Sequence, residues 1–477
     1  MKKYIIFILF IFLFSSCKKL LDEQVYAQLG PSNFYNNADD AEALLNGVYT
    51  QAQGYRDLVR DRLAFNAMTT DIFWESGGSI NTQCQPMIDF TWDATHPWLH
   101  GFWNRAYADI YKANIVLDKV PAIPMNEDRK AQILAEARFL RAVNYFDLYN
   151  LFGPVPLITT SAVSATDRPS RATQEECLTF IATELTAVSQ VLPPTQEQFY
   201  RATSGAALAF LCKLQLNNHQ WQQAAETADK IIKSGVYHLF TEGKRTALFA
   251  LSNEENKAFI WSIPFMVKGV GSGNTYYSHA VPPDYLFQYP PKVNFAAQIK
   301  VRTAFVNTFE PGDERLEAFL FSYENTAHKT IALGKDDIRD FKYPEDPDGI
   351  GDVSGNDFPV LRYADILMSR AEALNALNGP NQQSIDLLNE VRQAAGLGPL
   401  SLADFPDTES LNTYILKARG WEFHGEGKRR IDLIRMGKFI EQAQARGKQA
   451  FDYQLLFPIP QGEIDKNANL KQNPGYE

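Results

Sequence analysis

The sequence is poor in cysteine, with only four among 477 residues: Cys17, Cys84, Cys177 and Cys212. The last three are odd in number and widely spaced, so they predict neither a disulfide framework nor a cysteine pair with metal-binding spacing. Cys212 lies in an apolar run, where a free thiol behaves as a small hydrophobic side chain. A fold held together by disulfides or by a cysteine metal centre is therefore disfavoured.

The chain also lacks an excess of basic residues, with 46 Lys and Arg against 56 Asp and Glu, and its formal net charge is −10. Because nucleic-acid phosphates require a basic surface, this balance argues against a nucleic-acid partner. Familiar catalytic signatures are missing as well: the sequence has no G-x-S-x-G elbow, P-loop or H-E-x-x-H motif. Their absence lowers the expectation of an enzyme, although an active site without a known motif stays open.

One long hydrophobic run is present, at the N-terminus. Lys2 and Lys3 precede an unbroken apolar stretch over residues 4–14, which small serines follow. A basic start, a short apolar run and small residues are typical of a secretory signal peptide. The run is shorter than the roughly 20 residues that a membrane-spanning helix needs. We therefore expect residues 1–16 to be a signal peptide that is removed.

Cys17 directly follows the small residues, as in bacterial lipoprotein signals, although Phe14 replaces the Leu that is usual three places before the cysteine. We expect Cys17 to become the acylated N-terminus; an ordinary signal with an incidental cysteine is the alternative. Several acyl chains would hold the protein at a membrane, since each buried CH₂ contributes ~0.8 kcal/mol. No second apolar segment approaches spanning length, so the sequence predicts an anchored protein rather than an embedded one.

Helical periodicity dominates two parts of the chain, about residues 35–235 and 360–440. Apolar side chains recur at spacings of three and four. These patterns predict helices over residues 106–120, 135–149, 173–191, 204–216, 221–232, 364–379, 385–395 and 411–423. Short turns join several of them into antiparallel pairs. Paired helices with Ala at contact positions resemble tetratricopeptide repeats, and predict a mostly α-helical superhelix.

Residues 239–359 have a different composition, which is rich in Gly, Pro, Asn, Asp and aromatic residues. Residues 259–263 suggest a short strand within it. Loops of this length in a compact protein are usually functional or disordered, and their aromatic content argues against disorder. We expect this region to form a loop-rich half that packs on the helices.

Six sequence blocks then become recognisable together. They are NRAYADIYKANIVLDKV (104–120), AEARFLRAVNYFDLYNLFGPVPLI (135–158), RATSGAALAFLCKLQL (201–216), LRYADILMSRAEALNALNG (361–379), ARGWEFHGEGKRRIDLIRMGKF (418–439) and LFPIPQGEIDKNANLKQNPGY (456–476). In this order they resemble the signature blocks of the SusD/RagB family, and the closing block is especially specific. The resemblance implies a single SusD-like domain over residues 17–477, with residues 456–476 as its C-terminal block.

The resemblance also implies a function. Family members are lipid-anchored at the outer membrane, face the cell exterior, and act as lids on SusC-like TonB-dependent transporters. They capture oligosaccharides, or peptides in some members, and they carry no catalytic residues. We therefore expect a glycan-binding lipoprotein without a cofactor. A peptide- or protein-binding member of the same family is the first alternative, and an enzyme with an unrecognised site is the second.

Aromatic residues make up 13% of the sequence. A flat ring can stack on the C–H face of a sugar, while neighbouring polar groups bind the hydroxyls. We expect ligand contacts from two loop regions, residues 74–98 and 269–289. The candidate residues are Trp74, Trp92, Asp93, His96, Trp98, Tyr276, Tyr277, Tyr285 and Tyr289. Burial of these rings in the core is the alternative, and it is the expectation for Trp103, Trp221 and Trp421, which fall on predicted helices.

Other polar clusters have simpler interpretations. His96 and His100 have the spacing of a zinc-binding helix, but no catalytic Glu or third ligand accompanies them. The Asp- and Gly-rich stretch over residues 346–357 resembles a calcium loop without the bidentate Glu of an EF-hand, so we expect a solvated turn, with a structural calcium as the alternative. Charged residues within 136–141 and 422–432 are expected to form ion pairs between helices.

Overall fold

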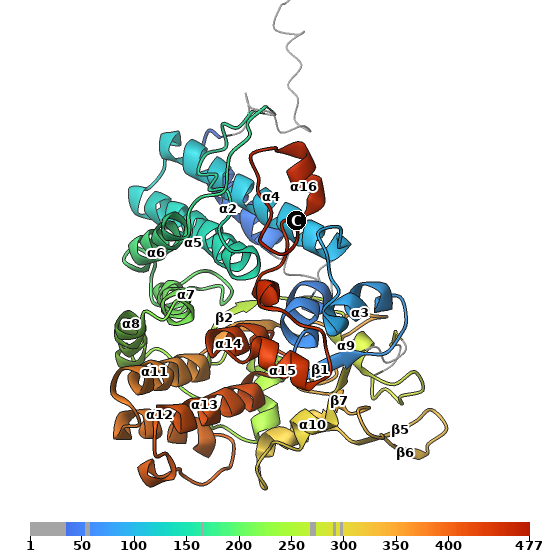
Figure 1. The fold of residues 1–477 in the computed structure, drawn as a ribbon. Helices are drawn as coiled ribbons and strands as arrows, with labels where there is room; N and C mark the ends of the chain where they lie inside the picture. The colour runs from blue at the N-terminus through green and yellow to red at the C-terminus, as the bar shows by residue number, and fades with distance from the viewer. Residues whose placement is uncertain (1–34, 53–57, 165, 268–272, 290–291, 296–298) are drawn as a thin grey trace, which may run out of the picture.

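The computed structural model describes residues 35–52, 58–164, 166–267, 273–289, 292–295 and 299–477 (Figure 1). The expected signal peptide and Cys17 lie outside these residues. None of the described helices is both long and apolar enough to cross a membrane.

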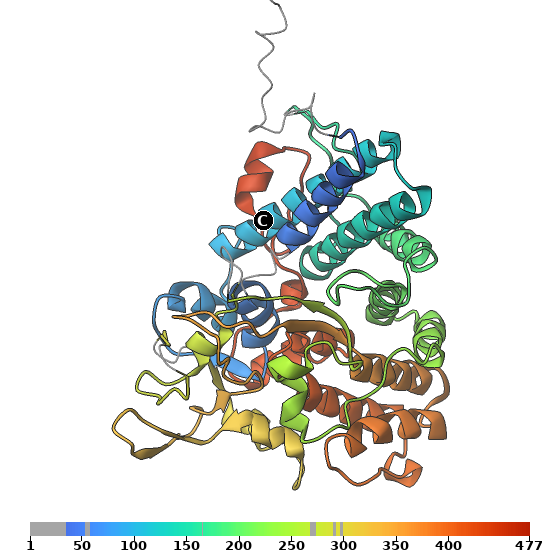
Figure 2. The same cartoon turned by 180° about the vertical axis from the view of Figure 1, so that it is seen from behind.

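Paired helices form one side of the molecule. Their bounds are α2 (Ala38–Ala52), α4 (Pro97–Lys119), α5 (Glu127–Phe152), α6 (Gln174–Ser189), α7 (Ser204–Asn217), α8 (Trp221–Lys233), α11 (Tyr363–Asn378), α12 (Gln382–Gln393) and α13 (Thr408–Phe423). Successive helices pack on one another from α4 through α5, α6, α7 and α8 to α11, and both α12 and α13 pack on α11. In Figures 1 and 2 they stack in a curved array. The predicted mostly helical, tetratricopeptide-like fold is confirmed.

Local sequence explains where several of these helices begin. Thr173 and Glu176 form a capping box at the start of α6, and Asp407 caps α13 through the backbone N–H of Ser410. Such caps satisfy N–H groups that have no partner within the helix. Gly153 ends α5 with a positive φ of 73°, a conformation that glycine adopts without a Cβ clash. Local sequence therefore indicates where these helices begin or end.

The loop-rich half consists of short strands that pair two by two, all antiparallel. The pairs are β1 (Phe73–Glu75) with β3 (Ile299–Val301), β2 (Phe259–Ile263) with β8 (Phe358–Arg362), β4 (Phe319–Leu320) with β7 (Arg339–Asp340), and β5 (Ser322–Glu324) with β6 (Thr330–Ala332). The expected strand over residues 259–263 is confirmed as β2. Short helices complete this half: α3 (Asn81–Asp89), α9 (Tyr276–Ala280) and α10 (Thr303–Val306).

The C-terminal region returns to the helical side. It contains α14 (Arg429–Arg435), α15 (Phe439–Ala445), the 3₁₀ turn η9 (Asp452–Leu455) and α16 (Gln461–Lys466). One continuous hydrophobic core runs through both halves, and includes Leu45 of α2, Phe139 of α5, Ile299 of β3, Phe358 of β8 and Leu470. The two halves therefore share a core rather than meeting at a solvated interface.

Buried charges also join the halves. Glu422 of α13 accepts hydrogen bonds from Arg245, from Arg315 at 3.1 Å and from Arg362 at 2.8 Å. Burial by itself would raise the pKa of the Glu422 carboxyl, but the three guanidinium groups outweigh it and hold that pKa well below its usual range. Between α5 and α6, Arg141 pairs with Glu184 at 2.6 Å. The ion pairs expected between helices are confirmed.

Candidate functional site

Trp74 lies at the centre of β1 and faces Lys300 of β3 across the strand pair. The Lys300 ammonium lies 5.3 Å from the centre of the indole ring, within the range of a cation–π contact. The indole N–H donates to the carbonyl of Asp336 at 2.8 Å. These contacts fix the orientation of the ring, which remains half-buried.

Charged side chains continue from Trp74 towards the tyrosines. Lys300 pairs with Asp337 at 2.7 Å, and Asp337 also accepts a hydrogen bond from Arg339 at 2.6 Å. Arg339 is buried and donates to the carbonyl of Ala280 at the end of α9. The chain of contacts therefore runs from β1 through β7 to α9.

Tyr285 and Tyr323 form the aromatic part beyond α9. Their ring centres are 6.1 Å apart with an interplanar angle of 30°, and both rings are half-buried. The Tyr323 hydroxyl donates to Asp284 at 2.6 Å. Desolvation and this carboxylate raise the pKa of Tyr323 to about 12, so the hydroxyl stays protonated at neutral pH. We call Trp74, Tyr285, Tyr323, Asp284, Lys300 and Asp337 the loop-side surface.

Two of the expected tyrosines do not belong to this surface. Tyr276 and Tyr277 lie on α9 and are only 2% and 7% exposed. The Tyr276 ring packs edge-on against Tyr343, and the Tyr277 ring packs against Phe341. The prediction that these rings bind ligand is wrong, because they fill the core beneath the loops.

The segment around Tyr289 is held instead by backbone hydrogen bonds to Glu345, which is half-buried. The backbone N–H groups of Gln288 and Tyr289 both donate to Glu345, each at 2.9 Å. Tyr289 itself remains half-buried. Tyr285 and Tyr289 therefore stay candidates for ligand contact.

Trp92 was expected to be a binding platform, but it is a core residue with 4% exposure. Its ring packs against Phe90 and Phe457, and its indole N–H donates to the Tyr476 hydroxyl at 2.7 Å. The C-terminal block folds over this segment and covers the ring. The prediction for Trp92 is wrong for that reason.

His96 and Asp93 shape the start of α4. His96 is 6% exposed and caps the helix by accepting a hydrogen bond from the backbone N–H of Trp98. Burial lowers the pKa of His96. Asp93 is exposed and accepts from the backbone N–H and hydroxyl of Thr95. The binding role expected for His96 is contradicted by its burial, whereas Asp93 is free to face solvent.

Trp98 is half-buried, and its ring packs edge-on against His96 with centres 6.3 Å apart. Trp74 packs against Lys300 instead, so the described contacts do not bring these two tryptophans together.

Tyr323 is part of the loop-side surface, although the sequence did not predict it as a ligand contact. Its strand is only three residues long and carries no periodic signal.

The Asp- and Gly-rich loop over residues 346–357 accepts hydrogen bonds from a lysine side chain of the same protein. The Lys292 ammonium donates to the carbonyl oxygens of Asp346 at 2.5 Å and Gly349 at 2.7 Å. The Asp346 carboxylate accepts from the backbone N–H groups of Asp348 and Gly355. Among the described residues, no group of three or more His, Cys, Asp or Glu side chains could hold a metal ion. The structural calcium stays an alternative without an assigned site.

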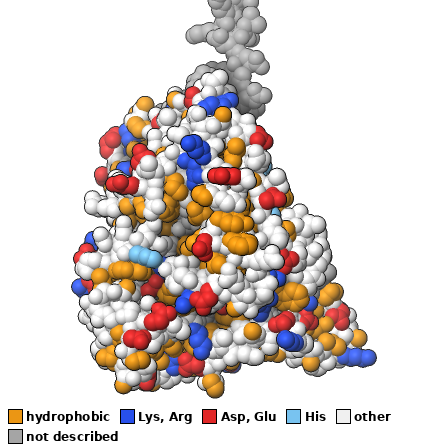
Figure 3. Space-filling view, in the orientation of Figure 1, with side chains coloured by type: hydrophobic (Ala, Val, Ile, Leu, Met, Phe, Trp, Pro, Cys, Tyr) orange, Lys and Arg blue, Asp and Glu red, His pale blue; other side chains and the backbone are white. Residues whose placement is uncertain are grey.

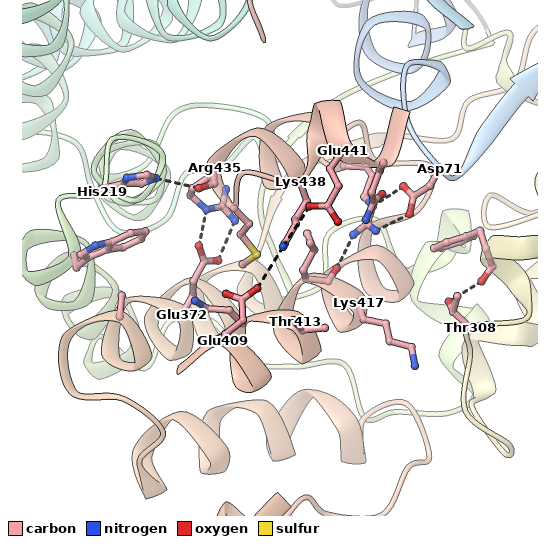
Figure 4. A pocket seen from close by; sticks show the side chains of 18 residues that line it. Asp71, His219, Thr308, Glu372, Glu409, Thr413, Lys417, Arg435, Lys438 and Glu441 are labelled. Atoms are coloured by element: carbon pink, nitrogen blue, oxygen red, sulfur yellow. Dashed lines mark hydrogen bonds and ion pairs between the residues drawn. The ribbon is translucent and has the colours of Figure 1, made fainter. Parts of the chain in front are cut away.

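A cavity of about 530 Å³ lies on the helical side, between α8, α11, α13 and α15. Its surroundings carry intermixed acidic and basic side chains in Figure 3. Figure 4 shows Arg435 between Glu372 and His219, with Lys438 reaching towards Glu409 and Glu441. Trp103 and Trp421 are buried as expected, but Trp221 is half-buried and lines this cavity. No local pattern predicts the cavity, because segments far apart in the chain form its wall.

Stacked helix pairs that carry a loop-rich half with aromatic side chains at its surface define a tetratricopeptide-like scaffold. The profile of the SusD family matches residues 338–476, and a second profile, described as starch-binding associating with outer membrane, matches residues 19–216. The chain therefore belongs to the SusD/RagB family. The family expected from the sequence blocks is thus confirmed.

Relatives match along nearly the whole chain. A SusD-like protein of Formosa agariphila is 25% identical over 100% of both chains. The starch-binding protein SusD of Bacteroides thetaiotaomicron is 24% identical over 95% of this chain and 91% of its own. The solved structure of a laminarin-binding SusD-like protein superposes with a TM-score of 0.79 at 26% identity, covering 93% of this chain and 100% of the other.

Proposed function

We propose that the protein is a non-catalytic lipoprotein that captures oligosaccharides through its loop-side surface. The observation that carries this proposal is that three half-buried aromatic rings lie beside hydrogen-bonding side chains in the loop-rich half: Tyr285 and Tyr323 lie together beside Asp284, and Trp74 lies beside Lys300. An indole or phenol face can stack on the C–H groups of a pyranose ring. The neighbouring carboxylates and Lys300 can bind hydroxyl groups with defined direction.

The charge pattern favours a neutral ligand. Lys300 and Asp337 neutralise one another at 2.7 Å, so the surface around Trp74 offers no concentrated charge of one sign. The relative that is 26% identical binds laminarin, and another relative binds starch. We therefore take a laminarin oligosaccharide as the first ligand to test.

Delivery forms the second part of the proposal. The matched profile is described as associating with the outer membrane, and the small residues before Cys17 fit a lipoprotein signal. We propose that Cys17 carries the lipid anchor, that the protein faces the cell exterior, and that it passes its ligand to a SusC-like TonB-dependent transporter.

Titration calorimetry with laminarihexaose tests the ligand and the surface together. Trp74→Ala should weaken binding by about tenfold, or about 1.4 kcal/mol, because one stacking platform is lost. Tyr111→Ala is the matched control, since Tyr111 is a 43% exposed aromatic residue on α4, in the helical half. Equal affinities of the two variants would remove Trp74 from the site. Binding of peptides instead of any glycan, or cleavage products on chromatography, would contradict the proposed function.

A further inference from the structure

The cavity on the helical side has the dimensions of a ligand site. Its volume of about 530 Å³ lies within the range of about 300–1,000 Å³ that is typical of small-molecule pockets. Arg435 stiffens one wall: its guanidinium donates to both carboxylate oxygens of Glu372, at 2.6 and 2.9 Å, and to Asp432 at 2.8 Å. These partners are buried, so the wall is formed before any ligand arrives.

An aromatic pair forms one end of this cavity. Trp221 is the first residue of α8, and its ring stacks on His219 with centres 4.8 Å apart and planes 15° apart. His219 has a positive φ of 58°, which is uncommon for a residue with a side chain. Its Nε2 bonds to the carbonyl of Arg435 at 3.0 Å. The histidine is therefore fixed in place and covers one face of the Trp221 ring.

The charges that line the cavity balance. Four acidic side chains are matched by four basic ones: Asp71, Glu372, Glu409 and Glu441 against Lys417, Arg429, Arg435 and Lys438. Arg429 pairs with Asp71 at 2.7 Å, and Lys438 lies 3.4 Å from both Glu409 and Glu441 (Figure 4). An anion would need an excess of basic groups and a cation an excess of carboxylates. The balance favours a neutral ligand.

Polar groups in the cavity have hydrogen-bonding capacity to spare. Asn412 lines the cavity, and its amide oxygen accepts a hydrogen bond from Asn375 at 2.8 Å, so its N–H₂ group remains available as a donor. Thr413 adds a hydroxyl to the lining. A ligand with several hydroxyl groups can satisfy donors and acceptors together.

We propose that this cavity is a second ligand site, which binds a short neutral saccharide of one or two rings. The sugar stacks near Trp221 and hydrogen-bonds to Thr413 and Asn412. The site shares no lining residue with the loop-side surface. The choice of a saccharide rests on the proposed function, whereas the location and the neutral charge rest on the cavity itself.

Saturation-transfer NMR and calorimetry with laminaribiose test this proposal. Both use a Trp74→Ala, Tyr285→Ala double variant, in which saccharide binding at the loop-side surface is weakened. We expect residual binding of laminaribiose there. Adding Trp221→Ala should weaken it at least tenfold, Trp221→Phe should restore part of it, and Thr413→Val should weaken it without removing a ring. Thermal melts of each variant check that it is folded. If Trp221→Ala does not fold, Thr413→Val is the variant that tests the cavity.

The outcomes separate the two proposals. If the parent binds laminarihexaose but residual laminaribiose binding is absent or indifferent to both Trp221→Ala and Thr413→Val, the cavity proposal fails and the proposed function stands. If neither the parent nor any variant binds a saccharide, both fail. Tighter binding of glucuronate or inorganic phosphate than of glucose at the cavity would overturn the neutral ligand class.

Discussion

Glu422→Gln is the most informative test of what holds the two halves together. Glu422 is fully buried and accepts hydrogen bonds from Arg245, Arg315 and Arg362, which are also buried. The glutamine keeps the volume of the side chain but removes its charge. Three guanidinium groups then share less negative charge in a site from which water is excluded, and we expect a large loss of stability.

The size of the effect follows from the burial of all partners. Removing one member of a buried ion pair costs about 3–5 kcal/mol, because the remaining charge stays desolvated. Unfolding entropy of about 2.1 cal/mol/K per residue implies a Tm shift of about 1 °C per kcal/mol for a chain of this size. Glu422→Gln should therefore lower Tm by about 3–5 °C.

Differential scanning calorimetry of the lipid-free protein at pH 7 measures the shift. Glu317→Gln is the matched control, because Glu317 pairs with Lys244 at 3.4 Å on the surface, where both side chains are exposed. Exposed pairs contribute about 0–1 kcal/mol. Equal Tm shifts of Glu422→Gln and Glu317→Gln would refute the reasoning that the buried network stabilises the contact between the halves.

Three further predictions concern the core, pH and the anchor. Trp92→Ala should lower the free energy of unfolding by about 3–5 kcal/mol, whereas the exposed Asp93→Ala should cost far less; similar melting curves would contradict the burial of Trp92. Burial raises the pKa of Glu254 to about 8 and that of Asp357 to about 7, so these carboxyl groups bind protons more tightly in the folded state than in the unfolded state. The free energy of unfolding should therefore fall as pH rises from 5 to 8.5, and a Glu254→Gln variant with the same pH dependence as the parent would argue against this. Cys17→Ala should abolish labelling by a clickable fatty acid, and equal labelling of variant and parent would exclude lipidation at that residue.

The sequence by itself determined the features that depend on short-range patterns. Apolar spacings located the C-terminal ends of α4, α5 and α11 to within three residues, because helix periodicity is a local property, but the predicted starts of α4 and α5 fall nine and eight residues inside these helices. The apolar run at residues 259–263 located strand β2 for the same reason. The ordered sequence blocks identified the family, and the neighbouring charges of residues 136–141 and 422–432 predicted ion pairs that the structure contains.

Tertiary structure decided which aromatic rings face solvent. Trp74 and Trp92 have similar sequence surroundings, yet Trp74 packs beside Lys300 at the surface while Tyr476, 384 positions away, bonds to Trp92 in the core. The cavity beside Trp221 likewise depends on α8, α11, α13 and α15 meeting in space. Burial is set by neighbours that the chain supplies from distant positions, so local sequence determines where helices lie but not which side chains they leave exposed.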